Sequence, residues 1–342
     1  MQIRLTQLDG KLPNLALMKL AAWHHSRGDD VRYVRGAAGA ERSLDEPSYD
    51  RVYASAIFKF SAPLIDRFTK EFPDAVVGGT GTDHKVTVEE IVGAEFGERF
   101  DYSAAPANFD ASIGFTQRGC RLKCKFCVVP GKEGKPRVVN TINGIWRGEP
   151  WPKHIHLLDN DFFGQPEADW RARVEEIRTG GFKVCFNQGL NVRLITPTAA
   201  EALATIEYRD DGFTRRRLYT AWDNLKDEAV FFRGVDTLER AGIPPTHLMA
   251  YMLIGFDPSE TWERIHHRFG AMVARGIRPY PMVFDTARRD LKRFQRWVVT
   301  GLYRAVPFEE YDAGRKAADA LDPRQMGLAF DGAATFMRGA PT

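Results

Sequence analysis

The stretch Gly119-Cys120-Arg121-Leu122-Lys123-Cys124-Lys125-Phe126-Cys127 holds three of the four cysteines in this 342-residue chain. Its three thiolates must converge on one object, because the loop is too short to serve two separate sites. A structural zinc site usually takes four protein ligands, often as two separated cysteine pairs. A cluster of four irons usually takes one cysteine thiolate per iron. A local set of three cysteines therefore leaves one iron of such a cluster open to another ligand.

The cysteine spacing, with Phe126 directly before the third cysteine, resembles the signature of the radical S-adenosylmethionine (SAM) superfamily. The resemblance implies that Cys120, Cys124 and Cys127 hold one 4Fe–4S cluster and that SAM chelates its open iron. It also implies reductive cleavage of SAM to a 5′-deoxyadenosyl radical, which modifies a substrate that the sequence does not identify. Such an enzyme needs an external electron donor of the flavodoxin or ferredoxin type.

The residues leave a second interpretation open, in which the cysteine stretch is a zinc-binding loop. Cys185, His154 or His156 would complete that loop, although no second cysteine pair lies near the first three. The chain would then be a metal-stapled nucleic-acid-binding module without catalysis. Its net charge of +3 is too small to indicate a nucleic-acid partner by itself.

The bulk composition is that of a globular protein large enough for two domains. Hydrophobic residues make up 44% of the chain and charged residues 27%. Four cysteines, three of them clustered, do not form a disulfide framework in a chain of this size. The amino-terminal residues lack an apolar signal segment, and no window approaches the ~20 apolar residues of a membrane helix. We therefore expect a cytoplasmic protein without a membrane partner.

Residues 1–100 alternate strand-like and helix-like segments. The apolar pattern predicts strands at 1–8, 31–34, 51–58 and 74–77 and helices at 14–27 and 62–71. This order predicts a small parallel sheet with helices on its faces. The loop 78–82 is glycine-rich and follows the last strand. It is either a ligand loop or, as we favour, a tight turn that needs the backbone freedom of glycine.

These first 100 residues resemble the Rossmann-like, cobalamin-binding-type domain that precedes the radical domain in one branch of the superfamily. The branch's histidine-ligand motif, Asp-x-His-x-x-Gly, is absent around all eight histidines. We expect a vestigial domain used for packing or for substrate binding; the alternative is cobalamin held without a histidine ligand, which would favour methylation of the substrate. A methylthiotransferase is disfavoured, because that family holds a second cluster on three further cysteines and no cysteine precedes Cys120. The segment 86–96 is expected to be a helix, and 102–106 an extended connector.

From residue 111 the alternation starts again and continues to about 285. Strands are predicted at 112–116, 155–159, 182–186, 217–222, 248–256 and 280–284, with helices at 167–179, 197–206, 227–241 and 259–275. Near-continuous apolar strands separated by helices favour a parallel sheet curled into a partial (β/α)6 barrel, which the resemblance also implies. Residues 286–342 are expected to form a helical extension. Its basic segment 288–304 is predicted to pack an apolar face of Leu291, Phe294, Trp297 and Val298 and to expose a solvated basic face.

Polar residues follow several predicted strands, where barrel-like folds gather their reactive groups. Asp159 and Asn160 end the second strand, at the position where the resemblance places the group that grips SAM's amino group. The superfamily segment is glycine-rich there, and this chain has Asp159-Asn160-Asp161. Asn191 and Arg193 follow the third strand with the same parity. A guanidinium pairs well with a carboxylate, so Arg193 is a candidate for SAM's methionine carboxylate, the alternative being a salt bridge elsewhere.

Two further sets of residues complete the expected site. Ile254 and Gly255 end the fifth strand, and the resemblance places them, with Phe126, beside the adenine of SAM. Asp223 and Asn224 follow the fourth strand and would bind ribose hydroxyls or cap the next helix. The cations of the cysteine stretch would lower the thiol pKa values or simply face solvent; they are Arg118, Arg121, Lys123 and Lys125.

Overall fold

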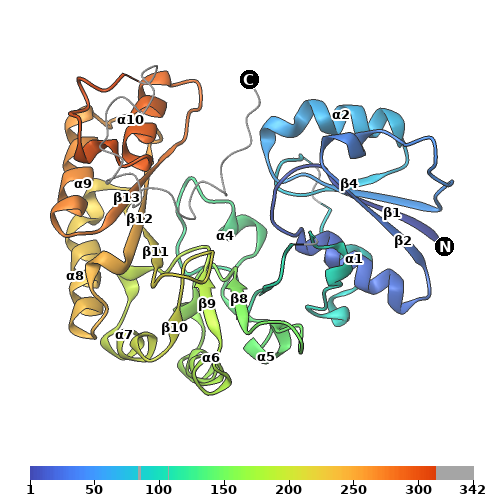
Figure 1. The fold of residues 1–342 in the computed structure, drawn as a ribbon, viewed down its shortest axis with the longest axis horizontal. Helices are drawn as coiled ribbons and strands as arrows, with labels where there is room; N and C mark the ends of the chain where they lie inside the picture. The colour runs from blue at the N-terminus through green and yellow to red at the C-terminus, as the bar shows by residue number, and fades with distance from the viewer. Residues whose placement is uncertain (84–85, 107, 313–342) are drawn as a thin grey trace. The chain divides into compact units, whose positions relative to one another are not determined.

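The computed structural model describes residues 1–83, 86–106 and 108–312. The chain divides into two compact units, the first over residues 1–110 and the second from Ala111 onward. Each unit is an α/β structure built on parallel strands (Figure 1). None of the helices in the described part of the chain is long and apolar enough to cross a membrane.

The first unit contains a sheet of four parallel strands in the order β2-β1-β3-β4. The predicted alternation of strands and helices is confirmed. The strands are β1 (Gln2–Gln7), β2 (Asp30–Arg35), β3 (Arg51–Ser55) and β4 (Val76–Gly78), and the crossover helices are α1 (Leu15–Ser26) and α2 (Ala62–Glu71).

Alternate residues of β1 face opposite sides of this sheet. Ile3 and Leu5 belong to the apolar cluster that includes α1, whereas Arg4 faces the side of α2. Arg4 is 0% exposed, and its Nε donates to Glu46 over 2.8 Å. Its guanidinium carbon also lies 4.5 Å from the ring centre of Phe72. A fully buried charge requires such partners, because an unpaired one is strongly destabilising.

Residues 86–106, near the end of the first unit, differ from the expected helix and connector. The predicted helix 86–96 ends early: α3 spans Val88–Val92, Gly93 has φ +83°, and a short 3-10 helix follows. The predicted extended connector at 102–106 is wrong. Tyr102–Ala104 form a 3-10 turn, because the Asp101 carboxylate accepts a hydrogen bond from the Ser103 N–H over 2.8 Å.

The second unit contains two parallel sheets, ordered β10-β9-β8-β5 and β11-β12-β13. The Leu190 N–H donates to the Tyr219 carbonyl over 2.7 Å and so links the chain after β9 to β11. All six predicted strands are present. They are β5 (Ser112–Gly114), β8 (His154–Leu157), β9 (Lys183–Phe186), β11 (Leu218–Ala221), β12 (Leu248–Ile254) and β13 (Arg278–Val283).

Three short strands were not predicted: β6 (Gln117–Arg118), β7 (Arg137–Val138) and β10 (Glu207–Tyr208). β6 and β7 pair antiparallel and enclose the cysteine stretch. At two residues each, these strands are too short to carry an alternation pattern. Their pairing depends on the loop that they close.

Helices lie along the outside of the strands of this unit (Figure 1). The predicted apolar face of the basic helix is confirmed, because Leu291, Phe294, Trp297 and Val298 are all buried. The remainder of the predicted helical extension, 313–342, lies outside the described residues. The helices are α4 (Val129–Lys132), α5 (Ile142–Ile145), α6 (Glu167–Gly180), α7 (Pro197–Ala204), α8 (Glu228–Arg240), α9 (Trp262–Ala274) and α10 (Arg289–Val299).

Candidate functional site

The cysteine loop follows β5 and β6 and runs into α4, so it starts at the carboxyl end of the edge strand of its sheet. Gly119 enters the loop with φ +85°, and a Cβ there would lie 2.3 Å from the Lys135 carbonyl oxygen. Only glycine fits this position. The Cys120 N–H donates to the Gly134 carbonyl over 3.3 Å, which closes the loop on itself. The three cysteines are half-buried and not in disulfides.

The segment after β8 holds this loop through side chains. The Asp161 carboxylate accepts hydrogen bonds from Arg121 Nε over 2.7 Å and from Arg121 Nη2 over 2.9 Å. The Asp161 side chain is 1% exposed. Gln117 accepts from the Asp161 N–H over 3.2 Å and donates to the Gly119 carbonyl over 2.7 Å. The bidentate, charge-assisted pair of Arg121 and Asp161 fixes the middle of the cysteine loop to the segment that follows β8.

Glu133 connects the two ends of the loop. Its Oε2 accepts from the Gly119 N–H over 2.9 Å and from Asn160 Nδ2 over 2.9 Å. Its Oε1 pairs with Arg118 Nη2 over 3.2 Å. Asn160, predicted to contact SAM, therefore contacts the chain's own loop.

Asp159 is also engaged within the protein. Its carboxylate accepts from the Thr116 N–H over 2.7 Å and from the Thr116 hydroxyl. Complete burial raises the pKa of Asp159 to about 7, although these hydrogen bonds oppose the rise. Both carboxylate oxygens of Asp159 thus bind Thr116, and the predicted contact of Asp159 with SAM stays a prediction. All three residues of Asp159-Asn160-Asp161 position the segment that carries the cysteines.

The expectation that nearby cations lower the thiol pKa is not met at Cys120. Burial raises its pKa, with the negative charge of Asp161 adding to the rise and a hydrogen bond from the Leu122 N–H opposing it. The guanidinium of Arg121 is bonded to Asp161. The positive charge of Arg121 is therefore largely compensated by Asp161 and does little to lower the pKa of the Cys120 thiol.

No group of three or more His, Cys, Asp and Glu side chains in the described ranges is placed to hold a single metal ion. The zinc interpretation gains no support from its proposed completing residues. Cys185 is 0% exposed within β9, and His154 and His156 pack on the ring of Phe213, with ring centres 4.5 Å and 4.8 Å away. A 4Fe–4S cluster binds each cysteine at a different iron, so its thiolates surround a larger object than one ion. Three soft sulfur donors on one fixed loop suit such a cluster.

Asn191 and Arg193 are brought together, though not as strand residues. Asn191 precedes a 3-10 helix, Val192–Leu194, and Arg193 Nε lies 3.4 Å from Asn191 Oδ1. Arg193 Nη1 already pairs with Asp227 over 2.9 Å. The buried Asn191 Nδ2 has no hydrogen-bond partner among the residues that the structure describes. An unpaired buried amide donor is costly, and a ligand oxygen would satisfy it.

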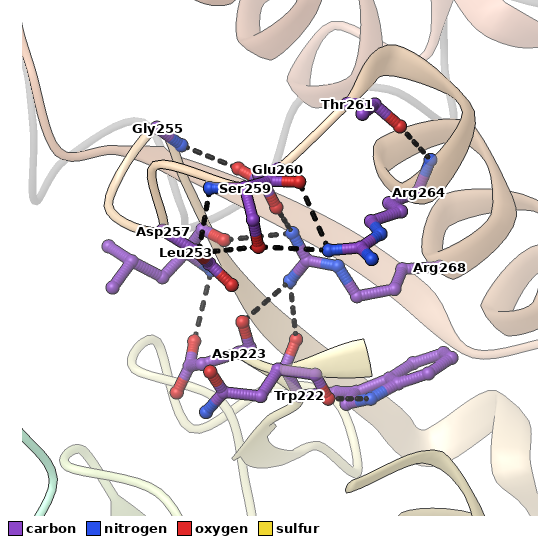
Figure 2. A network of polar contacts seen from close by, with 11 residues as sticks. Trp222, Asp223, Leu253, Gly255, Asp257, Ser259, Glu260, Thr261, Arg264 and Arg268 are labelled. Atoms are coloured by element: carbon purple, nitrogen blue, oxygen red, sulfur yellow. Dashed lines mark hydrogen bonds and ion pairs between the residues drawn. The ribbon is translucent and has the colours of Figure 1, made fainter. Parts of the chain in front are cut away.

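A buried ion pair at the ends of β11 and β12 was not predicted (Figure 2). Arg268 is 1% exposed, and its guanidinium donates to the Trp222 carbonyl over 3.0 Å, to the Leu253 carbonyl over 3.0 Å and to Glu260. Glu260 in turn accepts from the Gly255 N–H over 2.7 Å. Arg268 thus connects the end of β12 to the residue after β11. In the sequence, the pair is marked only by Glu260 lying just before α9 and Arg268 lying eight residues later within it.

Asp223 lies in the same network (Figure 2). Its carboxylate accepts from the Leu253 N–H over 3.0 Å, and burial raises its pKa. The following helices have no side-chain cap hydrogen bond, so the expected capping role is not seen, and ribose binding stays a prediction. The carboxylate connects the chain after β11 to β12.

Phe126 contacts the segment that follows β12. Its ring centre lies 5.5 Å from that of Phe256, and Phe256 lies 4.9 Å from Phe284, both edge-to-face. The predicted neighbours Phe126 and Gly255 are thus brought together, with Gly255 half-buried at φ +78°. Ile254 is 0% exposed, and its side chain belongs to the core. The contact joins a loop after the edge strand of one sheet to the end of a strand in the other.

Three tyrosines form a row across β11, β12 and β13. The ring centres of Tyr219 and Tyr251 are 6.1 Å apart, and those of Tyr251 and Tyr280 are 5.5 Å apart. Burial raises the pKa of all three phenols. The thiol of Cys185 lies close enough to raise the pKa of Tyr219 and Tyr251 further, so these side chains share one face.

No family model matches the chain, and no curated protein matches it. The site's own geometry and chemistry therefore carry the functional assignment. The features that bear on it are three half-buried thiols on a fixed loop, adjacent aromatic rings and one unsatisfied amide donor.

Proposed function

We propose that the chain is a radical SAM enzyme in which Cys120, Cys124 and Cys127 hold a 4Fe–4S cluster and SAM occupies its open iron. The observation that carries this proposal is a three-thiol loop fixed from two sides by Asp161 and Glu133. The remaining cysteine is fully buried within β9, so the ligand count of the loop stays at three.

The arrangement of the strands supports the finer proposal of a partial (β/α)6 barrel. The bond from Leu190 to Tyr219 continues the sheet order from β9 to β11. The contact between Phe126 and Phe256 then brings the loop after the first strand to the end of the fifth. A flat sheet would keep these two strand ends apart, so both observations favour a curled one.

Each residue near the loop has a proposed role in binding SAM. When bound, the cluster supplies the electron that cleaves SAM to methionine and a 5′-deoxyadenosyl radical. Phe126 offers a ring to the adenine, and the unpaired amide of Asn191 donates to a polar oxygen of SAM. SAM's carboxylate shares Arg193 with Asp227. Asp159 and Asp161 act as positioning residues, because their carboxylates bind Thr116 and Arg121.

The first unit supports a reaction without cobalamin. Its strand order reverses between β1 and β3, where open parallel sheets place their ligands. There the Asp9 carboxylate accepts from the Ile57 N–H over 2.7 Å, from the Phe58 N–H over 3.0 Å and from the Ser61 hydroxyl over 2.6 Å. The protein's own carboxylate thus uses the donors that a ligand would need. We propose hydrogen-atom abstraction rather than cobalamin-dependent methyl transfer.

The glycine-rich loop after β4 contributes to this closure. A Cβ on Gly79 would lie 2.1 Å from the Ala56 carbonyl oxygen, and one on Gly81 would lie 2.5 Å from that of Phe58. The loop 78–82 therefore needs glycine to pack against the loop after β3. This is the tight-turn interpretation favoured by the sequence.

Metal analysis and SAM cleavage after anaerobic reconstitution test the proposal. Wild-type protein is expected to bind about four iron and four sulfide per chain and, with a reductant, to release 5′-deoxyadenosine. Cys124→Ala should lose this activity, whereas the matched control Cys185→Ala should keep it. One zinc per chain without iron would favour the nucleic-acid-binding module and overturn the proposal. So would 5′-deoxyadenosine formation by Cys124→Ala.

A further inference from the structure

A cavity of about 390 Å³ lies at the amino-terminal ends of β11, β12 and β13. Arg217 precedes β11, Thr246 precedes β12 and Arg278 begins β13, and all three line it. The cysteine loop and Phe256 lie at the carboxyl ends of strands in the same unit. The cavity is therefore separate from the site proposed for SAM.

The lining of this cavity is strongly basic. Four of its residues are arginines, and none of the lining residues that the structure describes is Asp or Glu. Burial lowers the pKa of Arg217, and the positive charges of Arg278 and Arg215 lower it further. Like charges gathered around a cavity repel one another until an anion joins them. The four arginines are Arg215, Arg217, Arg278 and Arg304.

Within the part of the chain that the structure describes, two helix ends and one carboxylate offset some of the charge of Arg217, Arg278 and Arg304. The last turns of α9 and α10 border the cavity, and a helix carboxyl end carries about half a negative charge. Asp210 lies close enough to favour the charged form of Arg217, although its carboxylate already accepts from the Thr214 N–H over 2.9 Å and the Arg215 N–H over 3.2 Å. Even with Arg215 left out of the sum, three guanidinium groups, less about one charge for the two helix ends and one for Asp210, leave about +1.

The walls also offer apolar contacts. Val273, Ile277 and Val298 line the cavity beside Tyr303, whose ring centre lies 5.1 Å from the guanidinium carbon of Arg304. The volume falls within the range of small-molecule sites, roughly 300–1,000 Å³. Guanidinium groups bind phosphoryl oxygens in a bidentate manner. A ligand that matches this lining has phosphoryl groups at one end and an apolar or aromatic group at the other.

We propose that this cavity binds a phosphorylated small molecule of the nucleotide class. Its phosphoryl groups contact the arginines, and its base packs between Tyr303 and the aliphatic residues. Arg278 is the residue to change, because its side chain makes no hydrogen bond or ion pair within the ranges that the structure describes. Replacing it removes a ligand contact without breaking an internal one.

Calorimetric titration of the full chain with ADP tests this proposal. Wild-type protein should bind ADP, and added pyrophosphate should compete with it. Arg278→Gln should weaken ADP binding at least tenfold, since a charge-assisted phosphoryl contact is lost. Arg289→Gln is the matched control, because Arg289 is an exposed residue at the other end of α10. Its affinity for ADP should stay within twofold of wild type.

Three results would overturn the proposal. The first is the absence of any heat of binding for ADP at millimolar concentration. The second is an equal affinity of Arg278→Gln and Arg289→Gln for ADP, and the third is tighter binding of a single-stranded oligonucleotide than of ADP. Unchanged melting temperatures of both variants without ligand would show that the fold is intact. The titration needs neither iron nor SAM, so its outcome is independent of the proposed radical chemistry.

Discussion

Both units place an aspartate after a strand and use its carboxylate to bind a neighbouring loop, but with different results. In the first unit Asp9 binds the backbone amides of Ile57 and Phe58, and the loops close over the crevice. In the second unit Asp161 binds the side chain of Arg121 within the cysteine loop, and the three thiols of that loop stay half-buried. The same strand–helix order therefore carries two different contacts: the aspartate joins two loops through backbone amides in one unit, and it holds the half-buried cysteine loop through a side chain in the other.

The largest effect is expected from removing the support of the cysteine loop. Asp161→Ala leaves Arg121 without its carboxylate, so the loop loses the contact that fixes its middle. We expect iron content after reconstitution and 5′-deoxyadenosine formation to fall at least tenfold. Glu175→Ala is the control, because it breaks an exposed arginine–carboxylate pair on α6. Full iron loading of Asp161→Ala would contradict the role given to this contact.

The next effect concerns the buried arginines, one in each unit. Arg268→Met leaves Glu260 without its charged partner and is expected to destabilise the second unit by about 3–5 kcal/mol. Urea unfolding followed by tryptophan fluorescence measures this, because six of the seven tryptophans lie after Ala111. Arg4→Met breaks the equivalent pair with Glu46 in the first unit. If it shifts the tryptophan transition as far as Arg268→Met does, the two units do not unfold separately.

A smaller, pH-dependent effect is expected from Asp159. Its pKa is about 7 in the folded protein and 3.8 in the unfolded chain, so between these values the folded state holds a proton that the unfolded state has released. The free energy of unfolding should therefore fall as the pH rises from about 4 to about 7, by about 4 kcal/mol at most. Asp159→Asn cannot titrate and should lack this component. Urea titrations at several pH values compare it with wild type and with the surface variant Asp290→Asn. Parallel curves for wild type and Asp159→Asn would refute the assignment.

The smallest effect should come from Asp9. Asp9→Ala removes three hydrogen bonds and is expected to cost about 1–3 kcal/mol in the first unit. The amides of Ile57 and Phe58 should then exchange with solvent faster, while SAM cleavage by the second unit stays unchanged. Hydrogen exchange measures both amides, with Asp66→Ala on the exposed face of α2 as the control. Unaltered protection would mean that Asp9 does not close the crevice.

The longer strands and helices were predictable because each rests on a local pattern. Apolar runs such as Leu248–Ile254 and the spaced apolar residues of α10 mark buried segments whatever their partners. The cysteine loop was equally visible, since its residues are contiguous in sequence. The α/β class of both units followed from these signals.

The contacts that define the site were not predictable, because they join distant segments. Thr116 and Asp159 lie 43 positions apart, and Arg121 and Asp161 lie 40 positions apart. A single sequence shows that an acidic residue follows a strand, but not whether it faces a ligand or another loop. Local capping by Asp101 also replaced the expected extended connector at Tyr102 with a 3-10 turn.

Glu133 has a consequence for how the protein would mature. Glu133 follows the last cysteine in the chain. Its carboxylate binds Gly119, the residue before the first cysteine, and Asn160, which follows the neighbouring strand β8. The ends of the cysteine loop are thus held by the polypeptide itself, so little chain entropy would remain to be lost on binding of the proposed cluster. Assembly would then follow folding, and a fully folded apoprotein could be loaded late by a cluster donor.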